Sequence, residues 1–201
     1  MKDAAIIIFQ KNPERGKVKT RLAKTIGEAK ALEVYRLLLQ HTHDQIALLD
    51  YDIFVYFEKE IDPAFVRNQR YVGALQDEGD LGQKMMDALK EVFARGYQKT
   101  IVIGSDCAEL NNKVLEEAID QLFDNDLVIG PARDGGYYLI GMKKLHDTLF
   151  KNMPWSTSEV FINTFTEAKR LGLKTSLLRE LTDVDVYEDL DEDLKMKLGI
   201  P

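Results

Sequence analysis

The stretch AAIIIFQKNPERGKVKTRL, residues 4–22, says most about how this chain folds and what it binds. Its first part, residues 4–9, is an uninterrupted apolar run, which predicts a buried strand. Five cationic side chains then fall within residues 11–21, beside a single acidic one. Pro13 and Gly16 predict that residues 11–22 form a loop rather than a helix face. A cationic loop after the first strand of an α/β pattern predicts a site for a phosphate-bearing ligand, and the alternative is a solvated surface loop.

Composition restricts the class of protein. The chain has 201 residues, 45% of them hydrophobic and 30% charged, which is typical of a globular domain with a sizeable core. Its net charge of −7 argues against nucleic acid as the main partner, although a local basic patch suffices for a nucleotide. Because Cys107 is the single cysteine, an internal disulfide is impossible, and a cytoplasmic protein is expected. We expect no signal peptide and no membrane span, since no apolar run approaches ~20 residues.

Short apolar runs alternate with helical patterns along the chain. Strands are expected at residues 4–9, 51–57, 70–75, 100–104, 127–130, 137–141 and 173–178. Helices are expected from about Glu28, along residues 81–93, after a cap at Asn111, and from a capping box at residues 156–159 to Gly172. This alternation predicts an α/β fold in one domain, with a largely parallel sheet and helices on both faces. Ligands of such sheets bind at the carboxyl ends of the strands.

A carboxylate stands at the end of the fourth expected strand, in Gly104-Ser105-Asp106. Its desolvation there is unfavourable unless something pairs with it, and a divalent cation with a nucleotide diphosphate is a natural partner. The alternative is that Asp106 caps a turn or the next helix. We expect Cys107 to be a small buried residue rather than a nucleophile, because no histidine lies near it in the sequence.

A second carboxylate precedes two glycines in Asp134-Gly135-Gly136, which lead into Tyr137 and the sixth expected strand. The glycines predict a tight turn with room for a ligand beside the backbone. We expect Asp134 to be exposed there with a functional role, and a simple Asp-Gly hairpin turn is the alternative. Two roles are open for Trp155: stacking on a base or sugar, or packing in the core.

The segment at residues 180–193 holds eight acidic residues and no lysine or arginine. Most of them are expected at a solvated helix start, where carboxylates are favourable. Asp183 and Asp185 precede that helix and are candidates for a second metal ligand, at even odds on charge alone. His41 and His43 are expected on the polar side of the first long helix, in a surface role rather than as ligands.

Five segments together carry a resemblance to a known family. They are residues 11–22 (K-x-P-x-x-G-x-V-K-T-R-L), Gln76 with residues 79–82, residues 104–107, residues 130–138 and residues 183–185. In this order they resemble a family of bacterial proteins labelled as glycosyltransferases, within the nucleotide-diphospho-sugar transferase superfamily. The resemblance covers nearly the whole chain. It implies the GT-A fold over residues 1–201: a three-layer α/β/α arrangement with a mostly parallel twisted sheet and one antiparallel strand.

The resemblance also implies a site. Nucleotide and phosphate would contact the residues Lys11, Gly16, Lys19, Thr20, Arg21, Gln76, Gly79, Asp80 and Gly82. Mg²⁺ or Mn²⁺ would bind Asp106 and Asp185, and the second of these is favoured because residues 185–190 match a late D-x-x-E-D-L segment of related nucleotidyltransferases. Gly135, Gly136, Tyr137 and Trp155 would form the acceptor or sugar side, with Asp134 and Asp106 as catalytic residues.

This chain departs from the family pattern at three places. Ala108 stands where proline is usual, Lys84 stands where arginine is common, and the D-x-D of many glycosyltransferases is reduced to Ser105-Asp106-Cys107.

Three functions are compatible with these residues. The first is metal-dependent transfer of a glycosyl group from a nucleotide-diphosphate sugar to a small acceptor. The second is nucleotidyl transfer, in which an NTP reacts with a phosphorylated small molecule and releases pyrophosphate. The third is a non-catalytic nucleotide-binding module.

Overall fold

The computed structural model describes residues 3–200, which form one seven-stranded sheet with the order β3-β2-β1-β4-β6-β5-β7. Six strands run parallel, and β6 runs antiparallel to both of its neighbours, β4 and β5. The strand bounds are β1 Ala4–Gln10, β2 Asp52–Phe57, β3 Tyr71–Leu75, β4 Lys99–Ile103, β5 Leu127–Pro131, β6 Tyr137–Met142 and β7 Thr175–Leu177. All seven expected strands, and the expected sheet with one antiparallel strand, are confirmed.

The apolar run at residues 4–9 becomes the central strand because both of its faces are covered. Ile6 pairs with Ile53 on one side and with Ile101 on the other. Ile6 faces one core cluster and Ile7 the other, and neither is exposed at all. Strands buried on both faces are continuously apolar rather than alternating, as observed here.

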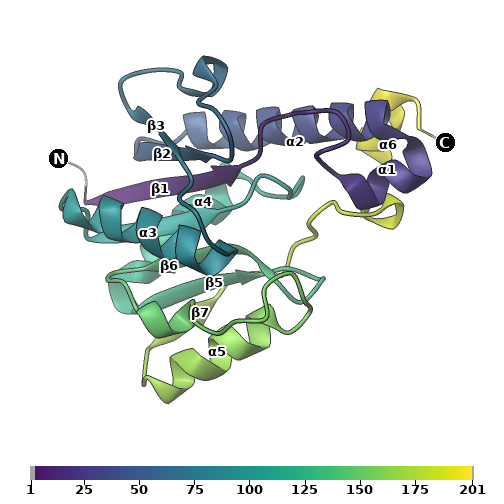
Figure 1. Ribbon diagram of the computed structural model, residues 1–201. Coiled ribbons are helices and arrows are strands. Elements are labelled where there is room, and N and C mark those ends of the chain that lie inside the picture. Colours follow the sequence, from purple (N-terminus) through teal and green to yellow (C-terminus); the bar gives the residue numbers. More distant parts are fainter. Residues whose placement is uncertain (1–2, 201) are drawn as a thin grey trace.

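Helices cover both faces, which gives three layers (Figure 1). α3 (Leu81–Ala94) and α5 (Val160–Arg170) pack on one face, and α2 (Glu28–Ala47) and α4 (Asn112–Asp124) pack on the other. Asn111 caps α4 as expected, because its side chain accepts a hydrogen bond from the amide of Val114. Short 3₁₀ turns lie at Pro63–Phe65, Asp147–Leu149 and Tyr187–Asp189.

Two local predictions were wrong. The cationic segment is a loop only as far as Lys19, since α1 (Thr20–Ile26) begins within it. The capping box at residues 156–159 is absent: α5 begins at Val160 without a side-chain cap. Thr157 Oγ1 instead donates to the carbonyl of Pro154 and accepts from the amide of Glu159, so its hydroxyl stabilises a turn before the helix.

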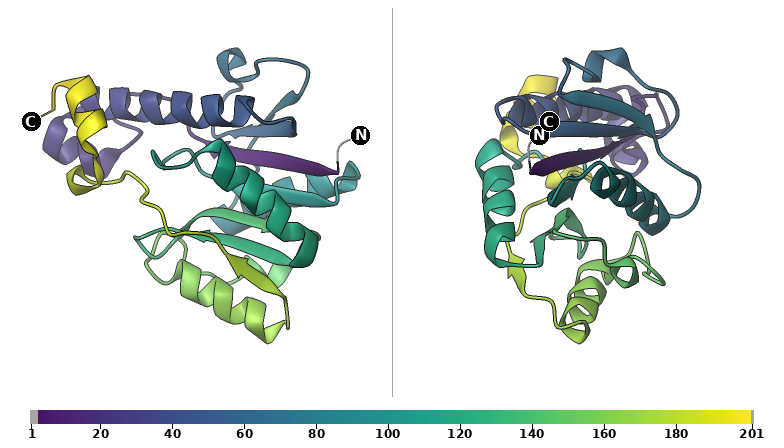
Figure 2. Two further views of the ribbon diagram at one scale, coloured as in Figure 1. Left: turned by 180° about the vertical axis from the view of Figure 1, so that it is seen from behind. Right: turned by 90° about the vertical axis from the view of Figure 1, so that its left-hand side faces the viewer.

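The acidic C-terminal segment returns to the sheet before it forms a helix. Isolated bridges pair Cys107 with Asp183 and Ala132 with Leu181, next to the ends of β4 and β5. The last helix, α6 (Glu192–Leu198), then packs beside α1 and α2 (Figure 2). The expected helix start therefore lies near the end of the acidic run, at Glu192 rather than across most of it.

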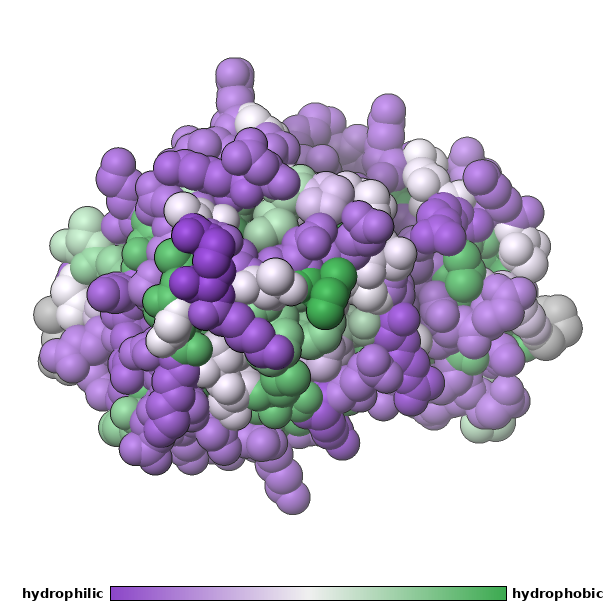
Figure 3. Space-filling view, turned by 90° about the horizontal axis from the view of Figure 1, so that it is seen from below, coloured by the Kyte–Doolittle hydropathy of each residue, from purple (hydrophilic) through white to green (hydrophobic). Residues whose placement is uncertain are grey.

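The surface is mostly hydrophilic on the face shown in Figure 3, where hydrophobic side chains form small, separate patches. Within residues 3–200, no helix is long and apolar enough to cross a membrane.

Candidate active site

A cavity of about 490 Å³ opens at the carboxyl ends of β1 and β4. It brings together many of the residues that the sequence singled out, from segments far apart in the chain. These lining residues are Lys11, Lys19, Thr20, Arg21, Gln76, Asp106 and Asp185. The topology explains their convergence, because the carboxyl ends of neighbouring parallel strands meet at one edge of the sheet.

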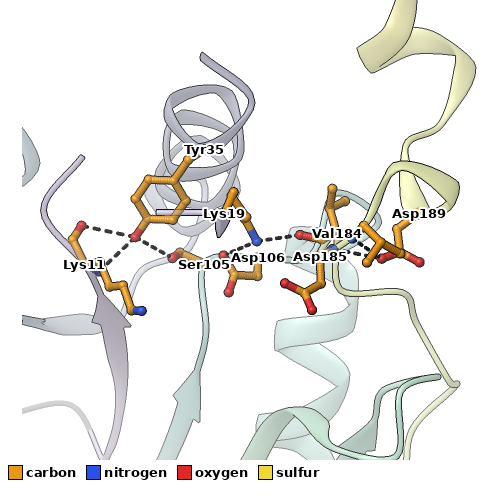
Figure 4. A network of polar contacts seen from close by, with 9 residues as sticks. Lys11, Lys19, Tyr35, Ser105, Asp106, Val184, Asp185 and Asp189 are labelled. Carbon is orange, nitrogen blue, oxygen red and sulfur yellow. Dashed lines mark hydrogen bonds and ion pairs between the residues drawn. The ribbon is translucent and has the colours of Figure 1, made fainter. Parts of the chain in front are cut away.

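Lys19 lies at the centre of this arrangement (Figure 4). Its Nζ lies 2.6 Å from Asp106 Oδ1 and donates to the carbonyl of Val184, also at 2.6 Å. The Lys19 side chain is 6% exposed, whereas that of Asp106 is 48% exposed and faces the cavity. Lys19 also has a φ of 48°, a left-handed conformation that is unfavourable for a residue with a Cβ. The unfavourable backbone conformation of Lys19 thus places its nearly buried ammonium group against Asp106, the predicted metal ligand.

A second ion pair lies beside the first. Arg21, in the first turn of α1, pairs with Asp185 of the C-terminal segment. The amides of Asp185 and Val186 both donate to Asp189 Oδ2, at 2.9 and 2.8 Å, which fixes the backbone that carries Asp185. Two of the predicted phosphate-binding cations, Lys19 and Arg21, are therefore each paired with a predicted metal-binding carboxylate.

Tyr35 joins the first loop to the end of β4. Its hydroxyl accepts from the amide of Lys11 at 2.8 Å, donates to the Lys11 carbonyl at 3.1 Å, and lies 3.4 Å from Ser105 Oγ. Burial raises the pKa of this phenol well above its usual range, so the hydroxyl stays protonated. Tyr35 lies within the helix expected from about Glu28, but nothing in the sequence singled it out for this polar contact.

Gln76 is oriented by two backbone carbonyls. Its Nε2 donates to Gln10 and to Tyr56, both at 3.1 Å, so its oxygen remains as the available acceptor at the cavity. Beneath it, the Gln10 side chain contacts His43 Nε2 at 2.7 Å. His43 is fully buried, and burial lowers its pKa to about 4, so the expectation of a surface histidine was wrong.

Other predicted nucleotide-binding residues do not line the cavity. Gly79 adopts a positive φ of 114°, and the Asp80 carboxylate caps α3 by accepting from the amide of Gln83. At Gly82 a Cβ would lie 2.4 Å from the carbonyl of Phe150, so glycine is required for close packing of α3. Gly16 has a φ of 75° in a turn beside Glu28.

The predicted acceptor side also lies outside the cavity lining. Asp134 is exposed and accepts from the amide of Gly136 at 2.8 Å. A Cβ at Gly135 would lie 2.1 Å from the carbonyl of Ser158, which joins this turn closely to the segment before α5. Tyr137 and Trp155 pack edge to face with centroids 6.4 Å apart, as half-buried side chains against a core cluster. Trp155 thus packs against the core with part of its surface exposed, and its stacking on a base or sugar stays a prediction.

Asp183 lies near both Asp106 at the cavity and Asp134 on the predicted acceptor side. Burial and the nearby carboxylates of Asp106 and Asp134 raise its pKa to about 7. Despite this crowding, residues 3–200 contain no group of three or more acidic, histidine or cysteine side chains arranged to hold a metal ion. The donors fit a hard cation such as Mg²⁺ only if substrate oxygens complete its coordination, which is the usual arrangement for Mg²⁺ at phosphates.

Several lining residues were not among the predicted site residues. They include Lys17, Glu58, Leu81, Lys84, Ser105 and Ser156. Ser156 has a φ of 64°, so two of the three non-glycine residues with positive φ in the described part of the chain line this cavity. Lys17, Leu81 and Ser105 stood inside quoted motifs, whereas Ser156 was expected only as part of a helix cap.

A family model described as "Uncharacterized protein conserved in bacteria (DUF2064)" matches residues 42–157, the part that holds Gln76, Asp106 and Asp134. The chain belongs to this family. No curated protein matches the sequence.

Among solved structures, a "putative nucleotide-diphospho-sugar transferase" from Desulfovibrio desulfuricans G20 is 29% identical, with a TM-score of 0.87 over 97% of this chain and 91% of that one. The inositol-1-phosphate CTP transferase from T. maritima shares the fold at 11% identity, with a TM-score of 0.62 over 98% of this chain and 95% of that one. So does a CMP:2-keto-3-deoxy-manno-octonic acid synthetase complexed with CTP, at 11% identity and a TM-score of 0.58 over 98% and 99%. The expected family, superfamily and fold are confirmed.

Proposed function

We propose that this protein transfers a glycosyl group from a nucleotide-diphosphate sugar to a small acceptor, with the help of a divalent cation. The observation that carries the proposal is the pair of adjacent ion pairs at one cavity, Lys19 with Asp106 and Arg21 with Asp185. A diphosphate needs cations and a metal ion needs carboxylates, and both sets meet at this point.

Donor binding would exchange the partners of these side chains. Lys19 and Arg21 would leave the carboxylates and donate to phosphate oxygens, where positive charge stabilises the leaving nucleoside diphosphate. Lys11 and Lys17 line the same cavity and have no carboxylate partner in the described part of the chain, so they would add charge without first breaking an ion pair.

Asp106 and Asp185 would hold the cation, Mg²⁺ or Mn²⁺. Bound there, the ion would neutralise charge that develops on the phosphate oxygens as the glycosyl bond breaks. The reduced D-x-D supplies one of these carboxylates and the C-terminal segment supplies the other. The bridge from Cys107 to Asp183 brings that segment to the end of β4.

The acceptor would approach from the side of Asp134. This carboxylate is exposed, is oriented by the Gly136 amide, and is close enough to Asp183 to raise the pKa of that residue. It would accept the proton of the acceptor hydroxyl as the new bond to the sugar carbon forms. Gly136 leaves the space beside the Asp134 carboxylate without a Cβ, and Gly135 lets the turn pack against Ser158.

Calorimetric titration of UDP-, GDP-, CDP- and ADP-sugars in the presence of Mn²⁺ tests donor binding. We expect at least one donor to bind in the micromolar range and Asp106→Asn to weaken it by at least about tenfold. Asp87→Asn in α3 is the matched control, because Asp87 is half-buried like Asp106 and does not line the cavity. If no donor binds the wild-type protein, the proposed function is wrong.

Nucleotidyl transfer is the second candidate, and one observation favours it. The cavity holds three lysines without carboxylate partners among residues 3–200, Lys11, Lys17 and Lys84, which is more charge than a diphosphate requires. The structures that share the fold include an inositol-1-phosphate CTP transferase and a synthetase complexed with CTP. Two incubations separate the candidates. NTPs with a panel of sugar phosphates and phospho-acids should release pyrophosphate if the protein is a nucleotidyltransferase. Nucleotide-diphosphate sugars with small acceptors should release a nucleoside diphosphate if it is a glycosyltransferase.

A further inference from the structure

The cations of the cavity come from two opposite walls. Lys11, Lys17, Lys19 and Arg21 belong to the loop after β1 and the start of α1, on the side of the sheet that α2 covers. Lys84 belongs to α3, which packs on the other face of the sheet (Figure 1). Ser156, from the segment before α5, lines the cavity on the Lys84 side.

Lys84 is placed unlike an ordinary surface lysine. It is half-buried, it lines the cavity, and no carboxylate in residues 3–200 forms an ion pair with it. It is the fourth residue of α3, where the helix dipole disfavours a cation, and its side chain leans toward the helix start at the sheet edge. An anion that enters the cavity would stabilise a half-buried cation in that position.

The phosphates of the donor would be bound by the opposite wall, through Lys19, Arg21 and the cation held by Asp106 and Asp185. Building on the proposed function, we infer that Lys84 binds a phosphoryl group beyond those of the donor diphosphate. Two sources share this chemistry: the terminal phosphate of a triphosphate, and a phosphate carried by the acceptor. The second source names the acceptor as a phosphorylated small molecule.

The test compares wild-type protein with Lys84→Met, and uses Lys90→Met as the matched control, because Lys90 is exposed on the same helix. Calorimetry with Mg²⁺ measures three probes: the tightest-binding of UDP, GDP, CDP and ADP, the matching triphosphate, and inorganic phosphate added to the diphosphate-saturated protein. Thermal unfolding of each variant checks that the fold is intact.

Two results would support the inference. If Lys84→Met weakens the triphosphate by about tenfold or more and leaves the diphosphate unchanged, the group is the terminal phosphate of the nucleotide. If it leaves both nucleotides unchanged and removes the binding of inorganic phosphate, the group belongs to the acceptor.

Two other results would overturn it. Equal losses for diphosphate and triphosphate, or no change with any probe, would contradict the assignment of Lys84 while the proposed function stands. If the wild-type protein binds none of the nucleotides, the proposed function fails and the inference fails with it.

Discussion

Lys19→Met should change the affinities for metal and for nucleotide in opposite directions. In the structure, Lys19 Nζ holds Asp106 Oδ1 at 2.6 Å, so a metal ion must displace it. Unit charges 2.6 Å apart interact by about 1.6 kcal/mol even at the dielectric constant of water, the limit suited to a half-exposed Asp106. Removing the lysine should therefore tighten the binding of Mn²⁺ alone by about tenfold. It should also weaken a nucleoside diphosphate by about tenfold or more, through the lost charge-assisted hydrogen bond.

Isothermal titration gives both quantities: Mn²⁺ alone, and the nucleoside diphosphate at saturating Mn²⁺. Lys24→Met is the matched control, because Lys24 lies exposed in the last turn of α1, the helix that follows Lys19. It should change neither affinity. A loss of affinity for both ligands would show that Lys19 acts only by supporting the fold, for instance through its bond to the Val184 carbonyl. An unchanged affinity for Mn²⁺ would refute Asp106 as a metal ligand.

Three other substitutions test parts of the structure around the site. Because the pKa of His43 is about 4 in the fold and about 6.5 when unfolded, the unfolded chain binds more protons in this range. Urea unfolding should therefore show that wild type loses about 2 kcal/mol more stability than His43→Gln between pH 7 and 4.5, and equal losses would contradict the buried neutral histidine. Gly135→Ala should destabilise by about 2 kcal/mol or more, because its φ is 89° and the new Cβ would meet the Ser158 carbonyl. Gly136→Ala should change stability by less than about 1 kcal/mol, because its new Cβ would lie 3.2 Å from the Asp134 carboxylate, an exposed side chain that can shift; similar values for the two would be inconsistent with the packed turn. Tyr35→Phe leaves the Lys11 amide without its partner and should lower both stability, by about 1–2 kcal/mol, and diphosphate affinity, while Tyr138→Phe, whose hydroxyl donates to Arg179 far from the loop, should lower stability alone; an unchanged affinity in Tyr35→Phe would refute its role in holding the loop.

The strands could be predicted because each is a short apolar run between polar turns, and burial on both faces leaves little choice of residue. The convergence of Lys19, Asp106 and Asp185 could also be predicted from the sequence, since each lies next to a helix or strand that the sequence identifies. The positive φ of Lys19 could not be predicted, because this backbone conformation is usual for glycine and not for lysine. It is stabilised by the tertiary contacts of Lys19 with Asp106 and Val184, which the local sequence does not reveal.

The missed residues share an ambiguous signal. Tyr35 and His43 lie on the buried stripe of α2. The sequence pattern does not indicate which neighbours their polar atoms contact. Residues 156–159 were expected to cap a helix because serine, threonine and glutamate stand at the spacing of a capping box. In the structure the Thr157 hydroxyl donates instead to the carbonyl of Pro154. Lys84 is distinguished from other helix lysines by lining the cavity, and this depends on where the fold places α3.

A crystal soaked with Mn²⁺ and the tightest-binding nucleoside diphosphate tests the proposed site most directly. We predict an anomalous manganese peak in contact with the carboxylates of Asp106 and Asp185, and phosphate oxygens within hydrogen-bond distance of Lys19 and Arg21, both of which will have left their present partners. A nucleotide bound elsewhere, or bound with both ion pairs intact, would contradict the exchange of partners on which the proposed function depends.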